Sequence, residues 1–236
     1  MVGRSALMAL VGWSNPSNLW LQAAIVGTWL GMLGLTAEVL HRKRWASPEA
    51  VRKVVHIGAG NVILLAWWLQ TPTWLGVAAS GLFSILTFLS YHLPILPSIN
   101  GVGRKSLGTF FYAVSMGILI LVFWPSTPAY AALGVLIMTW GDGLAALIGQ
   151  RFGKHCYKIW GMGKTWEGSL TMAGVSLGVS GAILIGQLGL SWQVLAIALV
   201  VAVVATTLEA FSKYGIDNLT VPLVSAAVAF WLGQRL

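Results

Sequence analysis

The distribution of charge between apolar segments constrains this chain of 236 residues more than any other feature. Eight apolar segments follow one another, and the connectors between them are alternately charged and uncharged. The charged connectors carry twelve of the fourteen Lys and Arg residues, and the other connectors carry none. Because Lys and Arg beside membrane spans stay on the cytoplasmic side, we predict that these connectors share one cytoplasmic face, where the function is to be sought. They are residues 41–53, 92–105, 150–167 and 212–218.

The composition predicts an all-α, polytopic membrane helix bundle. The chain is 57% hydrophobic and 8% charged, whereas a soluble protein has about 25% charged residues. Each apolar segment is near the roughly 20 helical residues that cross a hydrocarbon core about 30 Å thick. We predict one domain over residues 1–236 with seven or eight transmembrane helices, the last segment being an eighth span or a surface helix. The predicted spans are 19–40, 54–70, 73–91, 106–124, 128–149, 168–189, 191–211 and 219–234.

The net charge of +8 does not require a nucleic-acid partner. The position of the basic residues in alternate connectors already accounts for it. Basic loops beside a bilayer more often meet anionic lipids or phosphate ligands. We therefore expect the lipid bilayer and a phosphate-bearing ligand as partners, and no nucleic acid.

Asp142 lies inside an otherwise apolar segment, between Gly141 and Gly143. An ionisable side chain at membrane depth is costly and indicates a functional site. The two glycines would let the backbone break or approach a ligand closely. An alternative is that Asp142 caps a half-helix that starts near Leu144, and capping is compatible with ligand binding.

The connector after this segment combines glycines with basic residues. Glycines allow backbone N–H groups to face oxygen ligands, and Lys and Arg supply positive charge, so the composition is typical of a polyphosphate site. Glu167 adds a carboxylate with which a divalent ion would bridge phosphate oxygens. The spacing is not that of a Walker A motif, and membrane topology alone remains an alternative reason for the lysines. The residues concerned are Gly149, Arg151, Gly153, Lys154, Lys158, Gly161, Gly163 and Lys164.

Two further clusters lie on the same predicted face. Glu209 ends the seventh span, and Asp217-Asn218 precedes the eighth, so these carboxylates suit metal ligation or a general base, with helix capping as the alternative for Asp217-Asn218. Arg52 and His56 share one helical face at i,i+4, where His56 would contact a phosphate or relay a proton. A histidine that only satisfies its own interfacial contacts is the alternative. Arg104-Lys105 is either a phosphate contact or topogenic.

These motifs resemble the polyprenol kinase family, which includes phytol kinase, dolichol kinase and the CTP-dependent diacylglycerol kinase. The resemblance covers about residues 50–235, and the last motif and the short length point to the phytol kinase branch. The matching segments are Gly141-Asp142-Gly143-Leu-Ala-Ala, Gly149-x-Arg151-Phe152-Gly153-Lys154, Lys164-Thr165-x-Glu167-Gly168-Ser169, Arg52-Lys53-x-x-His56, Gly108-Thr109, and Glu209 to Pro222 with its Asp217-Asn218-Leu-Thr-Val-Pro222 end.

The resemblance implies a membrane kinase that phosphorylates a long-chain prenyl alcohol with CTP or UTP. The acceptor would be phytol, with geranylgeraniol and farnesol as further candidates, and phytyl phosphate would feed tocopherol synthesis. Such an enzyme lies in the cell or thylakoid membrane with its active face on the cytoplasmic side. A hydrophobic alcohol would arrive laterally from the bilayer, and phosphoryl transfer would then need mainly positioning and charge neutralisation.

The nucleotide-binding residues that follow from the resemblance and the composition are all basic residues or glycine. Arg151, Lys154 and Lys164 are expected on the nucleotide phosphates. Gly153 and Arg52 are expected to assist nucleotide binding.

The expected metal and catalytic residues are carboxylates and one histidine. Asp142 and Glu167 are expected to bind Mg²⁺, with Asp142 also catalytic. Asp217 or Glu209 would complete the metal shell or accept the proton of the alcohol. His56 is a further catalytic candidate.

Two other functions remain as alternatives. A CTP:lipid cytidylyltransferase of the CDP-diacylglycerol synthase type has a similar core, but its Lys-Asp-rich C-terminal signature is not found here. A small ion-coupled transporter would use Asp142 and Glu209 as ion ligands. Against it, the ionic residues gather at one face instead of along a pathway at the bilayer midplane.

Overall fold

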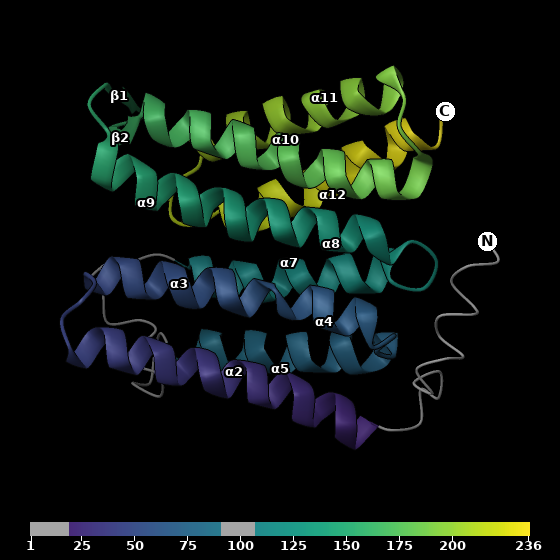
Figure 1. Cartoon of the computed structure of the whole chain (residues 1–236), viewed down its shortest axis with the longest axis horizontal. Helices are drawn as coiled ribbons and strands as arrows, with labels where there is room; N and C mark the ends of the chain where they lie inside the picture. Colours follow the sequence, from purple (N-terminus) through teal and green to yellow (C-terminus); the bar gives the residue numbers. More distant parts are fainter. Residues whose placement is uncertain (1–18, 91–106) are drawn as a thin grey trace.

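The computed structural model describes residues 19–90 and 107–236, which form a helical bundle with one short β-hairpin (Figure 1). In this part of the chain, six helical rods are long and apolar enough to cross a membrane, and two shorter apolar helices accompany them. The all-α membrane bundle predicted from the sequence is thus confirmed. The helices are α2 (Leu19–Arg42), α3 (Pro48–Gly60), α4 (Val62–Trp68), α5 (Thr73–Ser90), α7 (Gly108–Phe123), α8 (Pro128–Leu136), α9 (Gly143–Phe152), α10 (Trp166–Leu188), α11 (Trp192–Ala210) and α12 (Asp217–Gly233).

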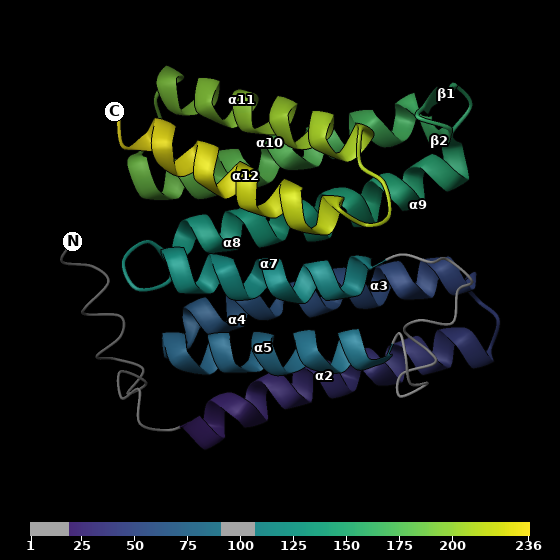
Figure 2. The same cartoon turned by 180° about the vertical axis from the view of Figure 1, so that it is seen from behind.

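The rods form two rows. One row contains α10, the continuous rod of α8 and α9, the rod of α3 and α4, and α2 (Figure 1). Behind it, α11, α12, α7 and α5 form the second row, as the reverse view shows (Figure 2). The short turns that follow α4, α7 and α10 lie at one end of the bundle, and the connectors that follow α2, α9 and α11 lie at the other end, as the sequence pattern predicts (Figure 1). Arg104 and Lys105 lie outside the described residues.

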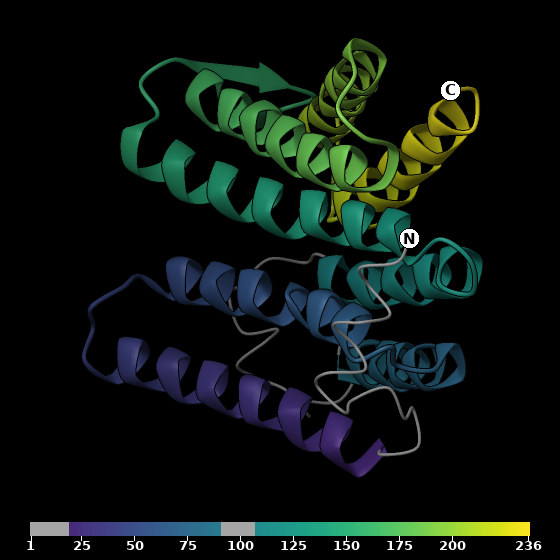
Figure 3. The same cartoon turned by 45° about the vertical axis from the view of Figure 1, so that its right-hand side comes forward.

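The rod of α8 and α9 runs through the centre of the molecule (Figure 3). After its first residue α8 is buried throughout, because α4, α7, α10 and α12 all contact it. Side chains such as Leu133, Ile137 and Met138 have no exposed surface. The rod that carries Asp142 therefore forms the centre of the core.

Two rods are irregular at neighbouring positions. The central rod winds into a π-helix, η1 (Ile137–Asp142), and α3 gives way to α4 at Asn61. The two irregularities are in contact, since Trp140 Nε1 donates a hydrogen bond to Asn61 Oδ1 at 2.8 Å. Gly60 lies against Thr139, whose side chain would collide with any Cβ at position 60. Single π-helical turns are frequent at functional sites.

The glycines beside Asp142 take part in helix packing. The rod does not break at Gly141 and Gly143, and Asp142 makes no side-chain capping bond. A Cβ on Gly141 would lie 2.5 Å from Met172 Sδ, and one on Gly143 would lie 2.5 Å from Ile57 Cγ1. These glycines therefore allow α10 and α3 to approach the rod closely.

The connector 150–167, predicted as a loop, contains a β-hairpin of β1 (Cys156–Ile159) and β2 (Met162–Thr165). The strands pair antiparallel, with Tyr157 opposite Lys164. Trp160 and Gly161 form the turn with φ angles of 49° and 81°, a region that Gly adopts readily. The strands have only four residues each, too few for a reliable alternating pattern in the sequence.

Candidate active site

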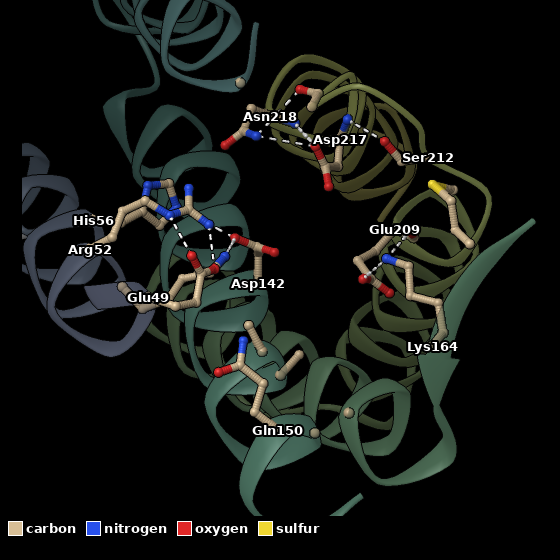
Figure 4. A pocket seen from close by; sticks show the side chains of 18 of the residues that line it. Glu49, Arg52, His56, Asp142, Gln150, Lys164, Glu209, Ser212, Asp217 and Asn218 are labelled. Carbon is tan, nitrogen blue, oxygen red and sulfur yellow. Dashed lines mark hydrogen bonds and ion pairs between the residues drawn. The ribbon is translucent and has the colours of Figure 1, made fainter. Parts of the chain in front are cut away.

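A cavity of about 830 Å³ opens at the charged end of the bundle, among six helices and the hairpin (Figure 4). Its walls come from α3, the start of α7, α9, β2, the starts of α10 and α12, and the end of α11. This volume lies within the usual range of about 300–1,000 Å³ for small-molecule sites. Side chains from four separate parts of the sequence point into the same hollow: Glu49, Arg52 and His56; Asp142 and Gln150; Lys164; and Glu209, Asp217 and Asn218 (Figure 4).

Helix direction gives this cavity a positive electrostatic bias. The alternation of connectors means that α3, α7, α10 and α12 all begin at this end, and the first turn of each contributes to the wall. The N-terminus of a helix carries roughly half a positive charge and exposed N–H groups, which together favour phosphate. At the start of α10, Thr165 Oγ1 accepts from Gly168 N at 3.1 Å, so one of these groups is already capped.

A buried ion pair forms the inner part of the cavity, which we call the floor and define by Lys53, His56, Tyr112 and Asp142. Lys53 Nζ donates to Asp142 Oδ2, across 89 positions of sequence. The Lys53 side chain is 6% exposed and that of Asp142 is 16% exposed. A carboxylate at this depth is costly unless it is paired, so Lys53 explains why the central rod tolerates Asp142.

His56 completes the floor, but its Nε2 atom forms no hydrogen bond there. This atom is buried, has no hydrogen-bond partner among the described residues, and lies 3.9 Å from Asp142 Oδ2. The imidazole ring packs against the ring of Tyr112, with centroids 4.8 Å apart and the ring planes tilted by 52°. Tyr112 is held in turn by a 3.3 Å hydrogen bond between its hydroxyl and Thr139 Oγ1.

A second ion pair lies at the outer edge, the rim, which we define by Lys164, Glu209, Asp217 and Asn218. Lys164 Nζ pairs with Glu209 Oε1 and also donates to the Glu209 carbonyl oxygen at 3.1 Å. Asp217 Oδ1 accepts from the backbone and side-chain nitrogens of Asn218 at 3.0 and 3.1 Å. The rim thus presents one cation and two carboxylates around the hollow.

The hairpin is what places Lys164 opposite α11. Tyr157 fixes β1 to α10 through a 2.5 Å hydrogen bond with Ser169 and ring contact with Trp166. At the tip, Trp160 packs edge-on against Phe211 with centroids 5.6 Å apart. With both ends held, β2 delivers Lys164 to the carboxylate of Glu209.

The structure brings six of the ten predicted site residues together. They line the cavity: Arg52, His56, Asp142, Lys164, Glu209 and Asp217. Arg52 forms hydrogen bonds of 3.0 and 2.5 Å with Glu49 there, so its charge is already shared. Asp217 and Asn218 are the first two residues of α12.

The other four predicted residues are not among those that line the cavity. Glu167 points instead to His155, with 2.8 Å between Oε1 and Nδ1. Arg151 and Lys154 are exposed, and Gly153 packs against Thr165. Glu167 is thus not among the residues that line the cavity with Asp142, and no group of three or more His, Cys, Asp and Glu residues able to hold a metal occurs in the described ranges.

Sequence reasoning missed Lys53, Glu49 and Gln150 as site residues, although all three line the cavity. A signal for Lys53 was present, because it stands beside Arg52 in the motif that was recognised and faces the same side as His56 at i,i+3. Gln150 had no comparable signal. Gln150 reaches the cavity wall because of where the end of α9 lies relative to the hairpin.

Comparison with known proteins settles the family. The chain is 49% identical to phytol kinase of Synechocystis sp. over 226 residues, which covers 94% of this chain and 97% of that protein. The chain belongs to the phytol kinase family. Within the family it is 27% identical to phytol kinase 1, chloroplastic, of Arabidopsis thaliana, over 87% of this chain and 75% of that one.

One further relative is named for a different acceptor alcohol. The chain is 28% identical to farnesol kinase, chloroplastic, of Arabidopsis thaliana, over 78% of this chain and 66% of that protein. No family model matches the chain, and no solved structure matches it. The resemblance to the polyprenol kinase family inferred from the motifs is thus confirmed by whole-chain similarity.

Proposed function

We propose that this protein phosphorylates a long-chain prenyl alcohol at the membrane, with phytol as acceptor and CTP as phosphoryl donor. The observation that carries the proposal is the cavity of about 830 Å³ at one end of a membrane bundle, in which two lysines, four carboxylates and four helix N-termini converge. The names of the relatives support phytol as the acceptor. The motif resemblance supports CTP, with UTP as the other candidate.

The rim suits the phosphates of the nucleotide. Lys164 lies beside the starts of α10 and α12, so an ammonium group and backbone N–H groups face the same volume. In the transfer, the alcohol oxygen forms a bond to the γ-phosphorus while the bond to the bridging oxygen breaks. The nucleoside diphosphate leaves and the alcohol proton passes to a carboxylate of the cavity. Positioning and charge neutralisation account for most of the catalysis of such a step.

The carboxylates fit the Mg²⁺ that such a donor requires. Mg²⁺ is usually held by one or two carboxylates together with phosphate oxygens and water, so a full set of protein ligands is not needed. Asp142 and Asp217 both point into the hollow (Figure 4) and would hold the ion, with Glu209 beside them. When bound, Mg²⁺ supplies positive charge to the phosphate oxygens during transfer.

The two ion pairs suggest how the cavity accommodates the charged substrate. In the structure Lys53 neutralises Asp142, and Lys164 neutralises Glu209. A metal–nucleotide complex brings a cation for the carboxylates and phosphate oxygens for Lys164. Lys164 then exchanges Glu209 for phosphate, the carboxylates gain the metal ion, and Lys53 stays paired with Asp142, so no buried charge is left unpaired.

The location follows from the same arrangement. The nucleotide is water-soluble and the alcohol is not, so the cavity must lie at the membrane surface. We place it on the cytoplasmic side of a cell or thylakoid membrane, in agreement with the positive connectors. Phytyl phosphate produced there would enter tocopherol synthesis.

The proposal is tested with the purified protein in detergent, phytol, Mg²⁺, and CTP labelled at the α- or the γ-phosphate. Label from the γ position alone should enter the organic phase. Incorporation of the α-label into an added phosphatidate lipid, without γ transfer, would instead identify a cytidylyltransferase. Substrate-dependent turnover of nucleotide also excludes a simple transporter.

A matched pair of variants links the activity to the cavity. Asp142→Asn changes the carboxylate that lies at the centre of the site, and activity should fall at least a hundredfold. Lys154→Gln removes an exposed cation that does not line the cavity, and it should leave most of the activity. Equal loss in both variants would contradict the assignment of this cavity.

A further inference from the structure

We propose that the hydroxyl group of the acceptor alcohol binds on the floor of the cavity, against His56 Nε2 and beside Asp142, while the nucleotide phosphates occupy the rim. The inference rests on the proposed function and specifies where each of the two substrates binds. The cavity then has two subsites of different chemistry. The floor takes a neutral hydroxyl and the rim takes a polyanion.

The first support is the unpaired nitrogen of His56. Nε2 is buried and has no hydrogen-bond partner in the described part of the chain, while the His56 side chain is 17% exposed and the residue is among those that line the cavity. A buried polar atom without a partner is energetically costly. A ligand that supplies the missing hydrogen bond recovers that energy, so the site favours a small polar group at this position.

The second support is the distance to the neighbouring carboxylate. His56 Nε2 and Asp142 Oδ2 are 3.9 Å apart, too far for a direct hydrogen bond. A single oxygen atom placed beside this gap can lie about 2.8 Å from both atoms. Lys53 holds the Asp142 carboxylate, and the ring contact with Tyr112 limits rotation of the imidazole. Both ends of the gap are therefore fixed before the ligand arrives.

Depth decides between a hydroxyl and a phosphate. His56 is the ninth residue of α3, so its backbone lies about 12 Å along the helix from Pro48, at 1.5 Å per residue. Asp142 lies ten residues before the end of α9, about 15 Å from that end. A multiply charged phosphate at this depth pays a large desolvation cost, whereas a hydroxyl with one hydrogen bond does not. The floor also lies nearer to the hydrocarbon region in which a prenyl chain dissolves.

The kinetic test separates the two subsites. His56→Leu removes Nε2, and the KM for phytol should rise at least tenfold while the KM for CTP stays within twofold. His56→Gln, which retains a polar group near Nε2, should recover part of the loss. His41→Leu makes the same substitution at an exposed histidine outside the cavity and should match the wild type. A rise in the KM for CTP, or no change in either constant, would overturn the inference.

A binding measurement on the unmodified protein covers the case in which His56→Leu does not fold. The chain has four histidines, so ¹⁵N-histidine labelling gives a simple NMR spectrum, with the His56 signal assigned by its loss in His56→Gln. Phytol without nucleotide should shift this signal, and by more than Mg²⁺ with CTP alone, which reaches His56 only through Asp142. The exposed His155 serves as the reference. A larger shift with the nucleotide alone than with phytol, or none with phytol, refutes the subsite.

The same experiment distinguishes the two levels of the argument. If wild-type protein transfers no phosphate from CTP to phytol, the proposed function fails, whatever the NMR signal does. If transfer occurs but the His56 signal ignores phytol, only the subsite fails. A phytol-dependent shift together with phosphate transfer supports both.

Discussion

Replacement of Lys53 by Met should destabilise the protein far more than an ordinary loss of a surface charge. The ammonium group of Lys53 contacts the carboxylate of Asp142 in the centre of the bundle, and the two side chains are only 6% and 16% exposed. Met fills a similar volume but leaves the carboxylate without its cation. Asp142 must then be buried as an unpaired charge or take up a proton.

The expected magnitude follows from the burial of the pair. Removing one partner of a buried ion pair costs about 3–5 kcal/mol. Because the cavity gives Asp142 some access to water, we expect the lower end, about 3 kcal/mol. For a chain of this size, each kcal/mol lowers the melting temperature by about 2–4 °C, which predicts a decrease of about 6–12 °C for Lys53→Met.

The assay is thermal unfolding in detergent, with a matched ion pair as the control. Arg42 and Glu38 form an exposed pair with 2.5 Å between Nε and Oε1 and side chains that are 78% and 53% exposed. Exposed ion pairs of this kind contribute little to the free energy of unfolding, so Arg42→Met should shift the melting temperature by no more than about 2 °C. The double variant Lys53→Met/Asp142→Asn should recover much of the loss, since no unpaired charge remains. If Lys53→Met melts within about 2 °C of the wild type, the buried pair does not contribute as reasoned.

Three further predictions follow from the site and its packing. Asp142→Asn and Lys164→Ala should each reduce phosphate transfer to phytol at least a hundredfold with normal expression, and normal turnover in both would disprove the site. Gly60→Ala should lower the unfolding free energy by about 1–3 kcal/mol, because the added methyl group collides with Thr139, whereas Gly27→Ala, with open space around it, should be neutral or slightly stabilising. Chelation with EDTA should abolish transfer, and added Mg²⁺ should restore it; activity that survives EDTA would exclude a divalent ion from the reaction.

The helices were predictable because their signal is local. Each predicted span overlaps a helical rod, from 19–40 against Leu19–Arg42 to 219–234 against Asp217–Gly233. A run of apolar residues that must satisfy its own backbone hydrogen bonds in lipid has no choice but a helix. The hairpin after α9 escaped prediction, since two strands of four residues depend on contacts such as that of Trp160 with Phe211.

The site was only partly predictable, for a related reason. Asp142 was found because a carboxylate in an apolar span has few structural explanations. Arg151, Lys154 and Glu167 carry the right chemistry, but none of them lines the cavity. Charge and residue type identify the candidates, whereas the direction of each side chain depends on the packing around it.

The sequence by itself determined that this is a helical membrane protein with its ionic chemistry at one end, because span length and the sidedness of Lys and Arg are properties of each segment alone. Only the tertiary structure decided which charges meet. Lys53 reaches Asp142 across 89 positions, and Lys164 reaches Glu209 across 45. Such pairs depend on helix packing, on close contacts such as that of Gly60 with Thr139, and on a hairpin fixed at both ends. No single segment contains that information.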